Sequence, residues 1–160
     1  MGRRIPRGGA YNFHPFRCSL SEHSSYVNEL LSPDTKEKKM PNEVVLVVED
    51  SPTLMCVITD LLQDSGYIVL TAADGEQALE KADSELPSLI LLDVILPGKN
   101  GFQVCRQLKG SPNTENIKII MMTSKTQDSD RFWGLKQGAD MYMTKPFDND
   151  ELLANIAKLL

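Results

Sequence analysis

Histidine and cysteine are scarce in this sequence, and it has no long hydrophobic run. The 160 residues include two histidines, His14 and His23, and three widely spaced cysteines without a CxxC pair. Histidine-based catalysis and a zinc site are therefore not expected. The absence of Walker A and GxGxxG runs argues against nucleotide binding. Aliphatic runs reach only four or five residues, too few to cross a bilayer, so we expect a cytoplasmic protein without membrane insertion.

Charge divides the chain into two parts. Residues 1–42 contain seven Lys and Arg against four Asp and Glu, whereas residues 43–160 contain ten against eighteen. An acidic domain repels phosphate backbones, so nucleic acid is not an expected partner. The alternative would use the basic and aromatic residues near the N-terminus: Arg3, Arg4, Arg7, Tyr11, Phe13, Phe16 and Arg17.

The first 42 residues contain Pro and Gly where a folded segment would have regularly spaced apolar residues. We interpret residues 1–42 as an N-terminal extension. Three interpretations of it remain open: a disordered extension, residues upstream of a true start at Met40, and a targeting peptide.

From residue 43 onward, short apolar runs alternate with amphipathic segments. The runs begin near Val44, Ile68, Leu89, Ile117 and Met141. This spacing suits a repeated unit of one strand and one helix. Near-continuous aliphatic strands indicate a parallel sheet covered on both faces. Residues 43–160 are thus predicted to form a doubly wound α/β domain with five parallel strands.

Two helix boundaries can be placed at the residue level. Ser51 is a suitable N-cap, Pro52 suits the first turn, and Gly66 would end the helix. The last helix is predicted to start at Asp148, with Glu151 three residues later in a pattern typical of a capping box.

Polar side chains follow four of the predicted strands: Glu49 and Asp50, then Asp93, Thr123 and Lys145. Ligand sites of open α/β sheets lie outside the carboxyl ends of the strands. These groups should therefore gather at one edge of the sheet.

Asp93 is the most informative of them, because it interrupts one of the most apolar stretches of the chain. A buried carboxylate without a counter-charge is costly. The alternative role, a helix N-cap, is disfavoured because Pro97 and Gly98 follow.

The clustered carboxylates require a cation. Glu49 and Asp50 could simply favour the next helix N-terminus, and Lys145 could be a solvated surface lysine. Together with Asp93, however, the acidic groups suit Mg²⁺, while Pro146 could hold a cis bond that aims Lys145 inward. We therefore predict that Asp93 is a nucleophile toward a phosphoryl group and forms an aspartyl phosphate.

Four segments resemble the CheY-like response regulator receiver domain of two-component signalling: VVLVVEDSPT, LLDVILPGKNG, IIMMTSK and GADMYMTKPF. The resemblance covers essentially all of residues 43–160. It implies a flavodoxin-like sheet in the order 2-1-3-4-5 with helices on both faces.

The resemblance also implies a donor, a metal and its ligands. Asp93 would accept the phosphoryl group from a sensor histidine kinase, for which the CheA type is a candidate. Asp50, Asp93 and the backbone carbonyl of Ile95 would bind Mg²⁺, with Glu49 assisting through water.

By the same resemblance, Thr123 and Lys145 would bind the phosphoryl oxygens. Tyr142 would be the aromatic switch that turns inward when Thr123 moves, although a half-buried strand tyrosine is the alternative. Phosphorylation would then reshape the face made by the fourth helix, fifth strand and fifth helix, where a downstream protein binds.

The sequence departs from many relatives at two positions that orient hydrolytic water, two residues after the acceptor and two after the threonine. These positions hold Ile95 and Lys125. An aliphatic side chain cannot position water and an ammonium group cannot accept its proton, so we expect slow self-dephosphorylation.

The stretch RFWGLKQGAD resembles single-domain regulators of the twitching-motility and phototaxis type, although Trp133 and Phe132 could simply fill core or helix surface. The length leaves no room for an output domain, so we expect signalling by contact from a monomer or a weak phosphorylation-dependent dimer. We expect no enzymatic activity beyond its own phosphoryl transfer and slow self-dephosphorylation. Two other classes of protein are alternatives. A haloacid dehalogenase phosphatase would need an acid where Ile95 stands, and a phosphorylation-independent interaction module would not need the complete site.

Overall fold

A computed structural model of the chain describes residues 42–124 and 128–160, and side chains are not described for residues 128–131. The predictions for residues 1–41 and for Lys125 lie outside this part of the chain. No helix in the described part is both long and apolar enough to cross a bilayer.

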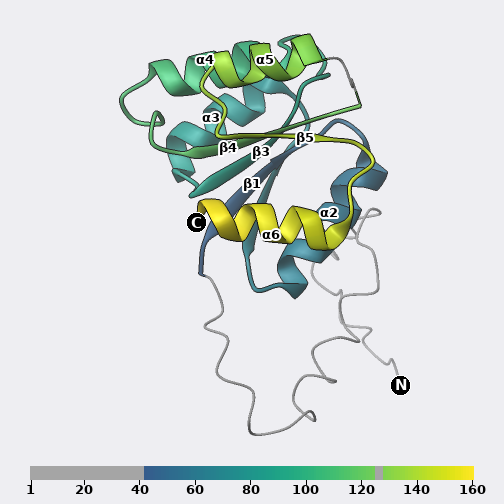
Figure 1. Cartoon of the computed structure of the whole chain (residues 1–160). Helices are drawn as coiled ribbons and strands as arrows, with labels where there is room; N and C mark the ends of the chain where they lie inside the picture. Colours follow the sequence, from purple (N-terminus) through teal and green to yellow (C-terminus); the bar gives the residue numbers. More distant parts are fainter. Residues whose placement is uncertain (1–41, 125–127) are drawn as a thin grey trace, which may run out of the picture.

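Strands and helices alternate along the described residues, as predicted. The elements are β1 (Val44–Val48), α2 (Pro52–Asp64), β2 (Ile68–Ala72), α3 (Gly75–Glu85), β3 (Leu89–Asp93), α4 (Gly101–Gly110), β4 (Lys118–Thr123), α5 (Asp128–Lys136), β5 (Met141–Thr144) and α6 (Asn149–Leu159) (Figure 1). Four strands begin at the predicted residue, and β4 begins one residue later, at Lys118.

The five strands form one parallel sheet in the order β2-β1-β3-β4-β5, which confirms the predicted topology. Strand β3 lies at the centre, and β2 and β5 are the edges. Val48 is paired with Leu92, Asp93 with Met122, and Thr123 with Thr144. This register brings the carboxyl ends of β1, β3, β4 and β5 to one edge.

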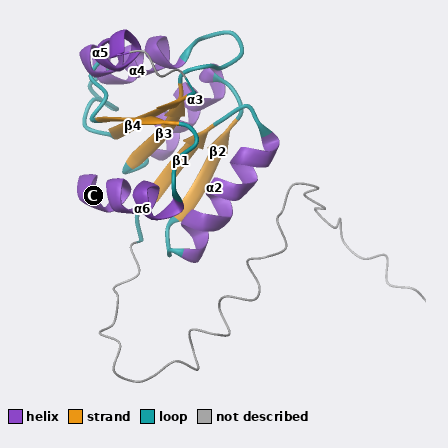
Figure 2. Cartoon of the chain, turned by 45° about the vertical axis from the view of Figure 1, so that its right-hand side comes forward, coloured by secondary structure: helices purple, strands orange, loops and turns teal. Residues whose placement is uncertain are grey.

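The sheet is covered on both faces, with α2 and α6 on one side and α3, α4 and α5 on the other (Figures 1 and 2). Alternate strand residues point to opposite faces. Val45 and Val47 belong to the core shared with α2 and α6, whereas Leu46 and Val48 belong to the core shared with α3 and α4. The strands are apolar throughout because each face is buried.

The side-chain cap predicted for the first helix, α2, is confirmed, and the one predicted for the last helix, α6, is not. The Ser51 side chain caps α2 by accepting from Leu54 N, and Gly66 follows the helix with a φ of 91°. The capping box predicted at Asp148 and Glu151 is wrong, because Asp148 makes no side-chain cap hydrogen bond. Its two members are both acidic, and like charges within one helical turn repel.

Candidate functional site

The polar groups that follow the strands meet at the carboxyl edge of the sheet, as predicted. Glu49 follows β1, Asp93 ends the central strand β3, and Lys145 follows β5. Glu49 and Asp93 are 3% and 4% exposed. Two carboxylates are thus held in the protein interior, where they need a counter-charge.

Lys145 supplies that charge. Its Nζ donates hydrogen bonds to Oε2 of Glu49 at 2.5 Å and to Oδ2 of Asp93 at 2.9 Å. The lysine side chain is only 17% exposed, so it points into the site as predicted. The Lys145–Pro146 peptide bond is cis.

Backbone N–H groups hold the other oxygen of each buried carboxylate. Oε1 of Glu49 accepts from Ser51 N at 3.1 Å, and Oδ1 of Asp93 accepts from Ile95 N at 3.0 Å. Both carboxylates are therefore fixed by one ammonium and one amide donor. A carboxylate held in this way is oriented before any ligand arrives.

Asp50 completes an acidic cluster. One oxygen from each of Glu49, Asp50 and Asp93 lies within 4.8 Å of the other two. Asp50 is exposed, so solvent reaches the cluster on its side. A few hard carboxylate oxygens beside solvent suit Mg²⁺, which keeps several waters when it binds. The residues present therefore fit this ion.

Burial and charge shift two pKa values in the site. Burial raises the pKa of Glu49 above its ordinary value of 4.5, and the hydrogen bonds from Lys145 and Ser51 N offset this only in part. Burial alone would lower the pKa of Lys145. The hydrogen bonds and negative charges of Glu49 and Asp93 outweigh it, so this pKa lies above 10.5 and the ammonium group stays charged.

Thr123 ends β4 at this edge of the sheet, and Tyr142 lies on β5, three residues before Lys145. Thr123 is fully buried, whereas its neighbour Ser124 is exposed. The carbonyl oxygen of Thr123 accepts from Lys145 N at 2.7 Å, which ties β4 to the lysine. Tyr142 is half-buried and packs against the core beneath α5.

The structure also reveals a role for Gly101 that its place in the sequence motif did not explain. A Cβ atom at this position would lie 2.3 Å from the carbonyl oxygen of Asp93 and 2.8 Å from Cα of Val94. Gly101 N donates to Val94 O at 2.8 Å. Only glycine lets the start of α4 approach the end of β3 this closely. The contact depends on tertiary packing, so no local sequence pattern predicts it.

Comparisons with known proteins agree with this geometry. The family model for the response regulator receiver domain matches residues 45–157. Protein PilH of Pseudomonas aeruginosa is 42% identical over 116 residues, which make up 72% of this chain and 96% of PilH. The transcriptional regulatory protein PhoP of Bacillus subtilis is 44% identical over 74% of this chain, but the chain spans only 49% of PhoP.

One similar solved structure contains a metal. It is the receiver domain of a sensor histidine kinase from Pseudomonas aeruginosa, with a magnesium ion coordinated in its active site cleft. It has a TM-score of 0.69 and 32% identity, and the alignment covers 74% of this chain and 97% of that one. Fold, acidic cluster and relatives lead to one conclusion: the chain belongs to the response regulator receiver domain family and is a phosphoacceptor signalling protein of two-component systems.

Proposed function

We propose that Asp93 is the residue that accepts the phosphoryl group, and that the donor is a phosphohistidine on a sensor histidine kinase. The observation that carries this proposal is the position of Asp93 at the end of the central strand, with one oxygen on Lys145 Nζ and the other on Ile95 N. An Asp93 carboxylate oxygen forms a bond to phosphorus while the bond between phosphorus and the histidine nitrogen breaks. The histidine leaves as imidazole and the product is an aspartyl phosphate.

The remaining polar groups have separate roles in this proposal. Mg²⁺ would be bound by Asp50, Asp93 and the backbone carbonyl of Ile95. Glu49 would assist through a water molecule. The bound ion supplies positive charge beside the phosphoryl oxygens. Lys145 then moves from the carboxylate of Asp93 to a phosphoryl oxygen as a point charge.

Thr123 and Tyr142 would carry the signal away from the acidic site. Thr123 ends β4, the strand next to Asp93, and its hydroxyl would donate to an oxygen of the phosphoryl group. Tyr142 packs on the same face of the sheet as α5. Movement of these two side chains would change the surface formed by α5, β5 and α6, which are the fourth helix, fifth strand and fifth helix of the predicted fold.

Exposed apolar side chains on α5 support this surface as the binding site for a downstream protein. Phe132 and Trp133 are 55% and 54% exposed. Their rings meet edge to face with centroids 6.4 Å apart, and Lys136 Nζ lies 4.7 Å from the Phe132 centroid. Exposed aromatic groups of this kind mark protein interaction sites.

We further infer a signalling protein that acts in the cytoplasm by contact, as a monomer or a weak phosphorylation-dependent dimer. The alignment with 96% of the length of PilH supports a regulator of single-domain type. Nucleic acid is not a proposed partner, because the part of the chain in the family match is acidic.

Slow self-dephosphorylation is part of the proposal. The side chain of Ile95 is 50% exposed and lies two residues after the acceptor, so it presents carbon atoms where a polar group would orient water. Replacing Ile95 with Asn should shorten the phosphoryl lifetime several-fold. An unchanged lifetime would count against this role.

The main experiment incubates the full chain with Mg²⁺ and acetyl phosphate. We expect one base-labile, acid-stable phosphoryl group, mapped to Asp93 by mass spectrometry. Asp93→Asn should remain unmodified, while Asp148→Asn, which changes an exposed aspartate at the start of α6, should be modified like the wild type. Modification of a different residue, or none, would overturn the proposal.

A further inference from the structure

A close contact between α5 and β5 lies outside the acidic site. Gly134 is a buried residue within α5. A Cβ atom placed on it would lie 3.0 Å from Cδ2 of Tyr142 and 3.2 Å from Sδ of Met121. Both distances are shorter than the optimal separation of non-bonded atoms. The missing side chain of Gly134 therefore provides the space in which the tyrosine ring lies.

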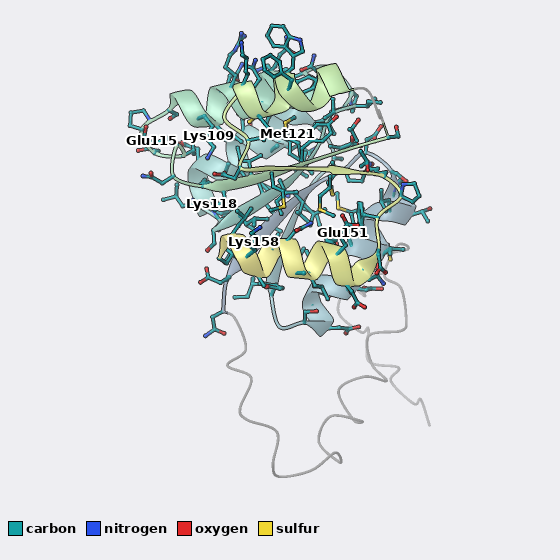
Figure 3. All side chains as sticks on the ribbon, in the orientation of Figure 1. Lys109, Glu115, Lys118, Met121, Glu151 and Lys158 are labelled. Carbon is teal, nitrogen blue, oxygen red and sulfur yellow. The ribbon has the colours of Figure 1, made fainter. Side chains whose placement is uncertain are left out.

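Of the two neighbours of Gly134, Tyr142 can move more easily than Met121. Met121 lies on β4 beneath α5 and is 0% exposed (Figure 3), so its displacement would open the core. Tyr142 is half-buried on the edge strand β5 and has solvent on one side. Its hydroxyl oxygen is nevertheless buried. A side chain at position 134 would push the ring away from this position.

The outer side of the same helical segment carries the exposed aromatic pair. Trp133 directly precedes Gly134, so a shift of α5 at Gly134 moves the indole ring with it. Trp133 is also the only tryptophan of the chain. Its fluorescence therefore reports on this segment of α5 without added labels.

We propose that Gly134 is a positioning residue: its lack of a side chain sets the place of the Tyr142 ring, and the ring couples the acidic site to the outer face of α5. The inference rests on the proposed function, in which phosphorylation at Asp93 is sensed by Thr123 and Tyr142. Coupling between two sites is reciprocal in free energy. In the proposed function the ring turns inward when Asp93 is phosphorylated, so a substitution that pushes the ring outward should weaken binding of a phosphoryl mimic at Asp93.

The test compares Gly134→Ala with Gly110→Ala. A Cβ atom at Gly110, the last residue of α4, meets nothing within 4 Å. Both variants make the same chemical change within a helix, but only the first meets Tyr142. The full chain with Mg²⁺ is titrated with beryllofluoride while Trp133 emission is recorded. We expect Gly134→Ala to bind the mimic roughly fivefold more weakly, at the low end of ordinary coupling between sites, and Gly110→Ala to match the wild type.

A urea denaturation cycle tests the contact without any phosphoryl mimic. Gly134→Ala should unfold at lower urea than Gly110→Ala in the wild-type background. When Tyr142→Leu removes the ring, Gly134→Ala should lower the midpoint much less, because only the contact with Met121 Sδ at 3.2 Å remains and alanine favours helix over glycine.

Two results would overturn the inference alone: equal beryllofluoride affinity in the two glycine variants, or the same effect of Gly134→Ala on the urea midpoint in both backgrounds. A wild-type chain whose Asp93 stays unmodified with acetyl phosphate overturns the proposed function, and the coupling fails with it. Mass spectrometry of the wild type thus separates the two failures.

Discussion

At the scale of single residues, Lys145 supplies the counter-charge of the acidic site, and we expect it to compete with a metal ion for that site. Its ammonium group lies between two buried carboxylates, Glu49 and Asp93. Replacing Lys145 with Met keeps the aliphatic length and removes the charge. We expect the variant to lose about 2 kcal/mol of unfolding free energy in the absence of Mg²⁺, because the carboxylates then repel each other in the interior.

The same variant should bind Mg²⁺ roughly tenfold more tightly, since a positive charge next to the ion has been removed. Titration calorimetry gives the affinity and urea unfolding gives the stability. Lys99→Met is the matched control: Lys99 pairs with Glu76 at 2.7 Å on the surface, where an ion pair contributes little. Unchanged Mg²⁺ affinity in Lys145→Met would show that the ammonium group does not compete with the ion.

Cys105 is a second residue whose surroundings control its ionisation. It is fully buried in α4, and burial raises the pKa of its thiol from 9.0 to about 11. A pKa raised in the folded state gives stability that is complete below pH 9 and is lost as the pH rises through about 11. The contribution is about 3 kcal/mol, because each pKa unit corresponds to about 1.4 kcal/mol.

The stability difference between wild type and Cys105→Ala should therefore shrink between pH 9 and pH 11. Urea unfolding at each pH measures it, and peptide mapping after alkylation at pH 9 should find Cys105 unmodified in the folded chain. A difference that stays constant over this range, or rapid alkylation, would contradict the prediction.

At the scale of secondary structure elements, the structure separates a helix start that is capped by side chains from one that is not. Asn100 and Gln103 form a capping box at the start of α4. At α6 the N-cap residue Asp148 makes no side-chain hydrogen bond. Asn100→Ala should therefore lower the unfolding free energy by about 1 kcal/mol, and Asp148→Ala by only a few tenths.

Urea unfolding of the two alanine variants checks this pair directly. Both residues are exposed, so changes in burial do not confuse the comparison. Equal losses would mean that the capping box at α4 adds no stability.

The elements themselves could be predicted from sequence to within one residue at the strand starts, because each strand is a short apolar run buried on both faces. Ser51 and Pro52 likewise mark the start of α2 by local chemistry alone. The cap of α6 could not be predicted. Asp148 and Glu151 have the spacing of a capping box, but both side chains are negatively charged and repel each other. Which polar group donates or accepts at a helix end is decided by its neighbours in space.

At the scale of the whole molecule, the convergence of Glu49, Asp93 and Lys145 could be predicted because parallel strands bring their carboxyl ends to one edge. The predicted placement needed only strand order and the residue after each strand. The clearances at Gly101 and Gly134 could not be predicted in this way. Each depends on contact with a residue that packing brings close, Asp93 in one case and Tyr142 in the other.

The acidic cluster should also couple metal binding to the stability of the entire fold, because Glu49 and Asp50 follow β1 and Asp93 ends β3, and unfolding separates these strands. An ion that binds only the folded chain stabilises it by about 1.4 kcal/mol at a concentration ten times its Kd. We expect Mg²⁺ to raise the thermal midpoint accordingly at constant ionic strength. Asp50→Asn should abolish most of this rise in the thermal midpoint, because Asp50 belongs to the acidic cluster. Asp50 is exposed and lies outside the core, so the substitution should not disturb the packing.

Asp150→Asn is the matched control for that experiment. Asp150 is an exposed aspartate in the first turn of α6, outside the acidic cluster, so its variant should keep the full response to Mg²⁺. If both asparagine variants lose the response equally, the ion acts through the overall negative charge of the domain. If only Asp50→Asn loses it, the stabilisation comes from the cluster at the carboxyl edge of the sheet, where the ion holds the ends of β1 and β3 together.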